Sequence, residues 1–430
     1  MGKKHKTEIR SAKRGQNERK GVHEWHPYYA GYSENFVDDV LNYMGATEAS
    51  IVLDPWIGSG TTAIVCQRRG IKSVGNEINP VMVIFTKAKS LNILEFDITS
   101  ILISIKNTVA ENDGLLEDYY DNQELLQFLD IYYWERLNKL RFAIDKVCRE
   151  LEKSKDKELV DCLLAFFYAA LFRSLRTVGN FKRGKNPTWL IKENYSSSSN
   201  NKINILGIYE KFVISMFNDL RNIYSKNSLL KAPLPEVYLG DSRKLTLKRN
   251  SVDFIITSPP YLTRIDYAIA TKPELLFLGY KEKSKFDLIR RATMGAPVIS
   301  DKSLKKNNNW GESCMSFLEK VEKHETKAAT SYYLPIFLQY FRDAYESLSE
   351  IKRVLKPKGK ACLVVQSSYF KDVEAKLGDI YAEIGDKLGL SASIIKREEI
   401  RQHLAHVNTK SSQYVKNKIY YEDAVLLEKR

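Results

Sequence analysis

Residues 252–261 constrain the fold of this chain more than any other stretch. An apolar run, broken only by Asp253, ends in Ser258, two prolines and Tyr261. A short apolar run with such an end is typical of a buried parallel strand. Because proline lacks an N–H and restricts the residue before it, the strand must end at Ser258. The sequence therefore predicts a rigid loop at the carboxyl end of a strand, where open α/β sheets bind their ligands.

A second stretch nearer the N-terminus has a similar organisation. Residues 51–54 form a short apolar strand ending in an acid, and residues 55–60 contain two glycines before a helical pattern begins. Glycines let a backbone approach a ligand closely, and the start of a helix offers unpaired N–H groups. Residues 72–77 then predict a second strand that ends at Glu77, where an acid typically accepts hydrogen bonds from ribose hydroxyls. These patterns predict a nucleotide-like cofactor at neighbouring strand ends.

Three kinds of ligand compete for the glycine turn. A nucleoside triphosphate loop needs a lysine after its last glycine, and none follows Gly60. The spacing of a nicotinamide dinucleotide fingerprint is formally met by Gly58, Gly60 and Ala63, so that cofactor stays a distant alternative. Neither ligand accounts for an Asp-Pro pair before the turn together with a Ser-Pro-Pro-Tyr loop later in the chain.

Together the two motifs resemble the amino-methyltransferases that use S-adenosylmethionine (SAM) on nucleic-acid bases. That family is defined by Asp-Pro-Phe-x-Gly-Ser-Gly-Thr and (Asp/Asn/Ser)-Pro-Pro-Tyr, and here Trp56 replaces the usual phenylalanine. The resemblance covers residues 23–95 and 233–430. It implies an α/β, Rossmann-like SAM-dependent methyltransferase fold, with a mostly parallel seven-stranded sheet, interrupted by a helical insertion at residues 96–232. Residues 281–330 are expected to form a second insertion or a flap.

The resemblance also implies a cofactor, SAM, and the residues that hold it, with no metal. Tyr28 belongs to a segment that in the family closes over the methionine end of the cofactor. Asp241 ends a strand, where its carboxylate would accept the adenine amino group. The residues expected to bind the cofactor are Tyr28, Asp54, Pro55, Trp56, Gly58, Ser59, Gly60, Thr61, Glu77, Ile78, Asp241 and Ser258.

The Ser-Pro-Pro-Tyr loop suits methyl transfer to an exocyclic amino group. The lone pair of such a nitrogen is delocalised, and acceptors on its N–H groups stabilise the charge that develops on it. We expect Ser258 Oγ and the Pro259 carbonyl to be these acceptors and Tyr261 to stack on the base. The expected catalytic residues are Ser258, Pro259, Pro260 and Tyr261.

The identity of the base is less constrained than the reaction. Methylation at cytosine C5 would need a Pro-Cys pair, and none of the 5 cysteines follows a proline. In the resembled family, serine directly before Pro-Pro-Tyr accompanies cytosine N4 methylation, whereas aspartate or asparagine at that position accompanies adenine N6 methylation. Cytosine N4 is therefore expected. Adenine N6, a base in RNA and a non-catalytic nucleic-acid-binding protein remain alternatives.

Charge points to a polyanionic partner. The formal net charge is +14, which favours nucleic acid. Residues 1–22 carry eight Lys and Arg against two Glu and are expected to be a disordered basic arm, with a phosphate-contacting arm as the alternative. Residues 172–192 combine basic and aromatic side chains, although their aromatics could also pack on helices. The expected DNA-binding residues are Arg173, Arg176, Lys182, Arg183, Lys185, Lys305 and Lys306.

Composition bounds the setting in which the protein works. The cysteines form no CxxC pair, so neither a zinc site nor a disulfide framework is expected. No run of eighteen apolar residues appears, and no membrane contact is expected. We predict a cytoplasmic, nucleoid-associated protein that acts on double-stranded DNA, with room for a companion restriction endonuclease.

Overall fold

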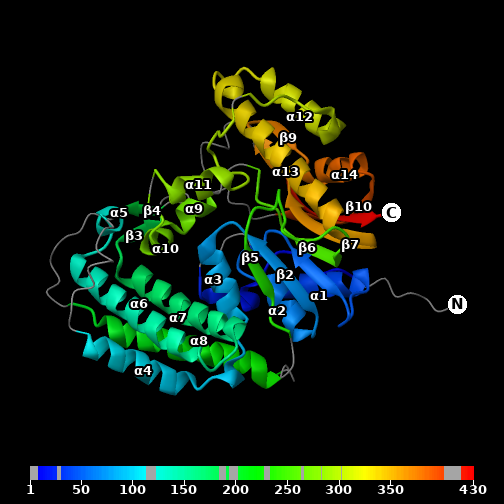
Figure 1. Cartoon of the computed structure of the whole chain (residues 1–430). Helices are drawn as coiled ribbons and strands as arrows, with labels where there is room; N and C mark the ends of the chain where they lie inside the picture. Colours follow the sequence, from blue (N-terminus) through cyan, green and yellow to red (C-terminus); the bar gives the residue numbers. More distant parts are fainter. Residues whose placement is uncertain are drawn as a thin grey trace.

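A computed structural model gives the arrangement of most of the chain (Figure 1). It describes residues 8–26, 31–112, 123–183, 190–192, 202–226, 233–262, 266–281, 283–301, 303–400 and 418–430. Within these residues no helix is both long and apolar enough to cross a membrane.

The centre of the molecule is a 7-stranded sheet with the order β10-β11-β7-β6-β1-β2-β5. Only β11 runs antiparallel to its neighbours, β7 and β10, and every other adjacent pair is parallel. The strands are β1 (Ile51–Asp54), β2 (Lys72–Glu77), β5 (Glu236–Leu239), β6 (Val252–Thr257), β7 (Leu355–Gln366), β10 (Leu390–Ile400) and β11 (Tyr420–Lys429). This confirms the predicted Rossmann-like fold, including its mostly parallel seven-stranded sheet.

Helices cover both faces of the sheet because successive strand residues point to opposite sides. On β1, Val52 packs with the helices α1 and α2, whereas Leu53 packs with α12, α13 and α14. The helices are α1 (Glu34–Met44), α2 (Thr61–Arg68), α12 (Glu312–Glu322), α13 (Leu334–Val354) and α14 (Leu377–Lys387). The sheet core is therefore closed on both sides, and its strand ends are left for ligands.

The predicted insertion is a layer of helices beside the sheet. It contains α4 (Ile98–Glu111), α5 (Gln123–Leu126), α6 (Ile131–Leu151), α7 (Lys157–Val178) and α8 (Ile205–Lys226). Residues 123–151 form two helices, because the Asp130 carboxylate caps a new helix start by accepting from Tyr132 N at 2.7 Å. Between this layer and the strands lies α3 (Pro80–Lys89).

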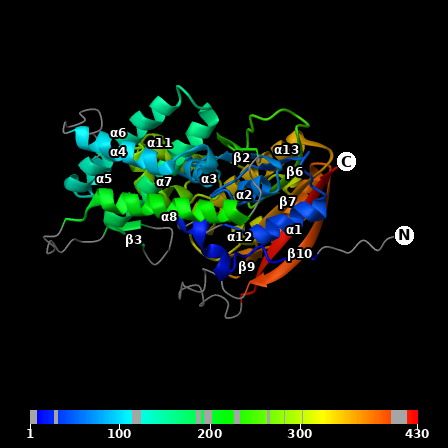
Figure 2. The ribbon, with the colours of Figure 1, turned by 90° about the horizontal axis from the view of Figure 1, so that it is seen from below.

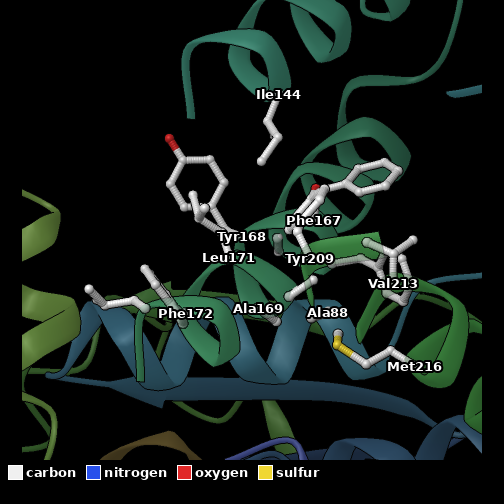
Figure 3. Packing of buried hydrophobic residues seen from close by; sticks show 14 of the residues in the cluster. Ala88, Ile144, Phe167, Tyr168, Ala169, Leu171, Phe172, Tyr209, Val213 and Met216 are labelled. Carbon is white, nitrogen blue, oxygen red and sulfur yellow. The ribbon is translucent and has the colours of Figure 1, made fainter. Parts of the chain in front are cut away.

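The helical layer shares one hydrophobic core with α3 and does not form a core of its own. Phe85 and Ala88 of α3 pack with Phe172 and Ala169 of α7, and the rings of Phe85 and Phe172 are 6.1 Å apart. Figure 3 shows Ala88 and Ala169 in close packing beside Met216 of α8. The layer is thus anchored on the helix that directly follows β2.

The N-terminal segment differs from the expected disordered arm. Residues 8–22 pack on the domain, because Ile9 and Ala12 join the core beneath α1 and Arg10 binds the Asp39 carboxylate at 2.7 and 2.8 Å. The segment continues through two 3-10 turns, η1 (Gln16–Arg19) and η2 (Gly21–Glu24), and the second lies against α8 (Figure 2). Residues 1–7 lie outside the described residues.

The remaining elements are short helices, turns and hairpins. They are α9 (Tyr267–Ala270), α10 (Lys272–Phe277), α11 (Lys285–Ala292), η3 (Ile93–Glu95), η5 (Asn308–Trp310), the π-helical turn η6 (Ala329–Tyr333) and two small hairpins, β3 (Phe181–Arg183) with β4 (Leu190–Lys192) and β8 (Ser368–Phe370) with β9 (Val373–Ala375). Helix α14 starts at Leu377, just after the strand β9.

Candidate functional site

The two sequence motifs meet at one edge of the sheet. β1 and β6 are parallel neighbours, with Val52 opposite Phe254 and Leu53 opposite Ile255. The chain leaves β1 toward β2 on one side, while β6 lies on the other side, so this is the topological switch point of the sheet. The crevice at such a point is where ligands bind in open α/β folds. The glycine turn and the Ser258 loop therefore open at adjacent strand ends.

Asp54 joins the motif segments from inside the protein. The residue is only 1% exposed. Its carboxylate accepts hydrogen bonds from Thr257 Oγ1 at 2.6 Å, from Tyr32 Oη and Thr62 Oγ1 at 2.7 Å each, and from Trp56 N at 3.1 Å. Burial raises the pKa of Asp54, and these donors act in the opposite direction. In this structure the Asp54 carboxylate is thus engaged by the protein and fixes the strand ends relative to each other.

Helix α3 holds the glycine turn from behind. Gly60 has a φ of +86°, and a Cβ there would lie 2.9 Å from the Thr86 side chain, so only glycine fits. Thr86 Oγ1 donates to the Gly58 carbonyl at 3.0 Å, and Lys89 Nζ donates to the Ser59 carbonyl at 2.8 Å. Because α3 engages both of these carbonyls, it fixes the orientation of two peptide groups in the turn.

Lys89 is a buried cation without a carboxylate partner among the hydrogen bonds of the described residues. Lys89 is 4% exposed. Burial, followed by the nearby Arg14 guanidinium, lowers the pKa of Lys89 to about 7. Arg14 itself donates to Thr61 Oγ1 at 2.9 Å, at the first residue of α2. Two basic side chains therefore bind the backbone turn and the helix start that follow β1.

Glu77 lies at the end of β2, beside the glycine turn. Its carboxylate accepts from Gly58 N at 2.9 Å and from Asn79 N at 3.0 Å. Burial raises the pKa of Glu77 to about 7. An ionised carboxylate has about four acceptor sites, so sites remain for hydroxyl donors of a ligand. Ile78, the next residue, is half-buried at the same strand end.

Asp241 follows β5 and has a strong partner within the chain. Arg243 Nε lies 3.0 and 3.1 Å from its two carboxylate oxygens, and Arg243 Nη2 lies 2.5 Å from one of them. The same guanidinium binds the buried Asp343 at 2.8 Å. An adenine amino group would therefore meet a carboxylate that is already neutralised by an anchored arginine.

The Ser258 loop is fixed by the elements around it. Ser258 Oγ donates to the Val364 carbonyl of β7 at 3.1 Å, so the lone pairs of its oxygen stay available as acceptors. The Pro260 carbonyl accepts from the buried Tyr340 hydroxyl at 2.9 Å. The Pro259 carbonyl has no hydrogen-bond partner among the described residues. Tyr261 is half-buried, and burial raises the pKa of its hydroxyl.

Two of the predicted DNA contacts are used inside the protein. Both arginines, Arg173 and Arg176, lie in the last part of α7, which continues to Val178 because its apolar pattern does. Arg176 pairs with Glu274, which is 0% exposed, and donates to the Ala270 carbonyl at 2.7 Å. The Arg173 guanidinium lies 4.3 Å from the Phe212 ring centroid. Neither guanidinium is placed as a free phosphate contact in this structure.

The other predicted contacts are placed less uniformly. Lys305 is exposed, whereas Lys306 pairs with Glu322 at 2.6 Å. Lys182 and Arg183 lie on β3, but the structure does not describe their side chains. Lys185 and Tyr28 lie outside the described residues.

Sequence reasoning missed the residues that support the motifs. Tyr32, Thr62 and Thr257 bind Asp54, and Thr86 and Lys89 bind the glycine turn. Lys89 had a signal, because helical spacing from Val81 and Phe85 places it on the buried face of α3. A lysine at an expected core position indicates a specific polar partner.

Comparison with known proteins supports the resemblance of this chain to DNA methyltransferases. A family model described as DNA methylase matches residues 5–87, which contain the glycine turn and β2. The chain is 25% identical over 325 residues to the type II methyltransferase M.BsoBI of Geobacillus stearothermophilus, with 70% of this chain and 61% of that protein covered. It is 22% identical to the type II methyltransferase M.MvaI of Kocuria varians, with 86% of this chain and 82% of that protein covered.

A solved structure was also found to be similar, but only weakly. It is described as a putative sarcosine dimethylglycine methyltransferase from Galdieria sulphuraria, with a TM-score of 0.33, 8% identity and coverage of 92% of this chain and 84% of that one. The resemblance to a family therefore depends on the family model and the sequence relatives. These matches confirm the resemblance of this chain to the DNA amino-methyltransferase family that its two motifs predicted.

Proposed function

We propose that this chain is a site-specific DNA methyltransferase that moves a methyl group from SAM to the N4 amino group of cytosine, as in restriction-modification. The observation that carries the proposal is the meeting of the glycine turn and the Ser258 loop at the ends of two adjacent parallel strands. The matches to a DNA methylase family model and to type II methyltransferases support DNA as the substrate.

The chemistry around the glycine turn fits SAM. The first turn of α2 has N–H groups without helical partners, which suit a carboxylate. Glu77 has acceptor capacity beyond its bonds to Gly58 and Asn79, which suits ribose hydroxyls. Gly58, Ser59, Gly60 and Thr61 would line the methionine end, while Ile78 and Asp241 would lie toward the adenine. When bound, the cofactor supplies a methyl group already activated for transfer.

The Ser258 loop would orient the amino group that accepts this methyl. Ser258 Oγ and the Pro259 carbonyl would each accept one N–H of the amino group. They would hold the amino nitrogen about 3 Å from the methyl carbon. Because the Ser258 hydroxyl proton is held by Val364 O, the oxygen can act as an acceptor without reorganisation. The two acceptors would stabilise positive charge as it develops on the nitrogen.

Reaching that position requires the base to leave the duplex. Extrusion costs a few kcal/mol, and stacking on the Tyr261 ring could return roughly 1–3 kcal/mol. The loop that carries Tyr261 is held by Tyr340 and β7, so the ring does not have to be ordered by the base. The proposal extends to a cytoplasmic, nucleoid-associated location and to a companion endonuclease.

Nucleoside analysis tests the proposal. Purified protein, labelled cofactor and mixed-sequence DNA should yield labelled 4-methylcytosine. Labelled N6-methyladenine would replace the base assignment, and label only in RNA would replace the substrate. Cofactor binding without transfer to any nucleic acid would favour a non-catalytic binding protein. Single-molecule sequencing of DNA from cells that express the protein then identifies the methylated sequence.

A further inference from the structure

Helix α11 presents an exposed leucine between two cations. Leu288 is 66% exposed, more than any other large apolar side chain among the described residues. Lys285 and Arg291 lie three residues before and after it, so all three share one face of the helix, and both cations are exposed. The buried Phe286 closes the opposite face, and the partly buried Ile289 packs against the same core. A single exposed leucine is common on proteins. Exposure alone therefore indicates no function, and the evidence for one comes from where the leucine lies.

Two contacts tie α11 to the Ser258 loop. Arg290 Nε lies 2.5 Å from a carboxylate oxygen of Asp266, which is 0% exposed. Asp266 caps α9 by accepting from Ile269 N at 3.2 Å, and α9 is the first helix after the loop. Beyond α11, Gly295 has a φ of +79° and lies so close to the Tyr261 carbonyl that a Cβ would be 2.6 Å from it. Figure 1 shows α9, α10 and α11 grouped together.

The charge of this face suits a polyanion. Lys285 and Arg291 on the helix and Lys283 just before it are exposed, while Arg290 pairs with Asp266. Asp287 is the acid on the described part of α11. Exposed lysines and arginines supply the phosphate contacts of nucleic-acid-binding proteins, and an apolar side chain between them is free to enter a base stack.

We propose that α11 contacts duplex DNA and that Leu288 enters the base stack at the target base pair, assisting extrusion of the base toward Tyr261. This inference rests on the proposed function, because it assigns the DNA-facing element of the same site. Lys285 and Arg291 hold the helix on the phosphates on either side of the leucine. The Arg290–Asp266 pair transmits the position of the helix to the start of α9, and so to the loop that receives the base.

The test compares wild type, Leu288→Ala and a matched control, Leu94→Ala, whose leucine is 57% exposed in η3. Each protein is given a duplex that contains the sequence that the enzyme methylates, and the same duplex with a mismatch at the target base. Since a mismatched base is easier to extrude, Leu288→Ala should be at least about tenfold slower than wild type on the matched duplex only. On the mismatched duplex its rate should lie within about twofold of wild type.

Leu94→Ala should match wild type on both duplexes. Equal rates of wild type and Leu288→Ala on the matched duplex would overturn the proposal, and so would equal slowing on both duplexes. A change of oligomeric state in Leu288→Ala would indicate a protein contact in place of DNA. Lys285→Ala gives an independent readout, because it should weaken DNA binding and reduce the salt slope by about 1. A wild-type protein that methylates neither duplex would instead count against the proposed function.

Discussion

The cofactor end and the proposed DNA-facing helix use their charged side chains in opposite ways. Around the glycine turn, Asp54 is 1% exposed and Lys89 is 4% exposed, and both are bonded to other parts of the chain. On α11, Lys285 and Arg291 are exposed. The first region therefore uses charge to hold a backbone shape before a ligand arrives. The second keeps its charge in water, where a polyanion can replace the solvent.

The largest effect is expected where a buried charge holds several elements. Asp54→Ala leaves the Tyr32, Thr62 and Thr257 hydroxyls without their acceptor, so it should lower the free energy of unfolding by about 3–5 kcal/mol. Chemical denaturation measures this. The control is Asp38→Ala, whose side chain is 44% exposed and pairs with Arg69, where the loss should be below about 1 kcal/mol. Equal stability of the two variants would mean that Asp54 does not hold the strand ends together.

The next effect concerns the chemical step. Ser258→Ala removes an acceptor aimed at the amino group, so kcat should fall about 10²-fold or more while the cofactor Kd changes far less. Single-turnover methylation and a binding titration separate the two quantities. Ser251→Ala, which removes a hydroxyl bonded to the Lys248 carbonyl at the surface, is the control. An equal loss of turnover and of cofactor affinity in Ser258→Ala would assign the serine a structural role.

A smaller effect is expected behind the glycine turn. Lys89→Met keeps most of the side-chain volume but removes the donor to the Ser59 carbonyl, so the cofactor Kd should rise about tenfold with little change in kcat. Lys87→Met, on the same helix, removes a partly exposed pair with Asp161 and should change neither quantity. If the two lysine variants bind the cofactor equally well, α3 does not set the geometry of the turn.

The smallest effect is a pH dependence of cofactor binding. Burial raises the pKa of Glu77 to about 7. Ribose hydroxyls donate to the ionised carboxylate, so affinity should rise as the pH increases through 7, by less than about tenfold between pH 6 and 8. The raised pKa has the opposite sign for stability, because the folded state binds the proton more tightly. The contribution of Glu77 to stability should therefore fall as the pH rises from about 4.5 to 7.

Glu77→Gln distinguishes the titration of this carboxyl from that of Lys89, whose pKa is also about 7. The variant should bind the cofactor with a flatter pH profile than wild type, and its unfolding free energy should lose less between pH 4.5 and 7. Isothermal titration and denaturation at several pH values give both profiles. Identical profiles for the two proteins would remove Glu77 from the ribose contact.

The sequence predicted those parts of the site that depend on backbone conformation. Proline at 259 and glycine at 60 restrict the chain whatever surrounds them, so the loop and the turn could be placed at strand ends. The sheet followed from the same strands. What the sequence did not indicate was the partner of each charge. Arg176 was expected to meet phosphate, yet it pairs with Glu274, which is 98 positions further along the chain.

The reason is that such pairings are made by tertiary structure. Asp241 follows β5, close to the strand end where the family pattern predicts it, but only the folded chain brings Arg243 and Asp343 together beside it. Residues 8–22 were expected to be a solvated arm because the sequence shows only that the segment is basic and polar. Their burial depends on Asp39 and on the surface of α1, which are distant in sequence.

The central claim is that the glycine turn and the Ser258 loop form one reaction centre. The most direct measurement is a crystal structure with an unreactive cofactor analogue and a duplex containing the methylated sequence. The account predicts the analogue on the turn after β1, with an extruded cytosine between it and Tyr261 and the amino nitrogen about 3 Å from Ser258 Oγ. An analogue bound elsewhere, or a base held away from the Ser258 loop, would contradict it.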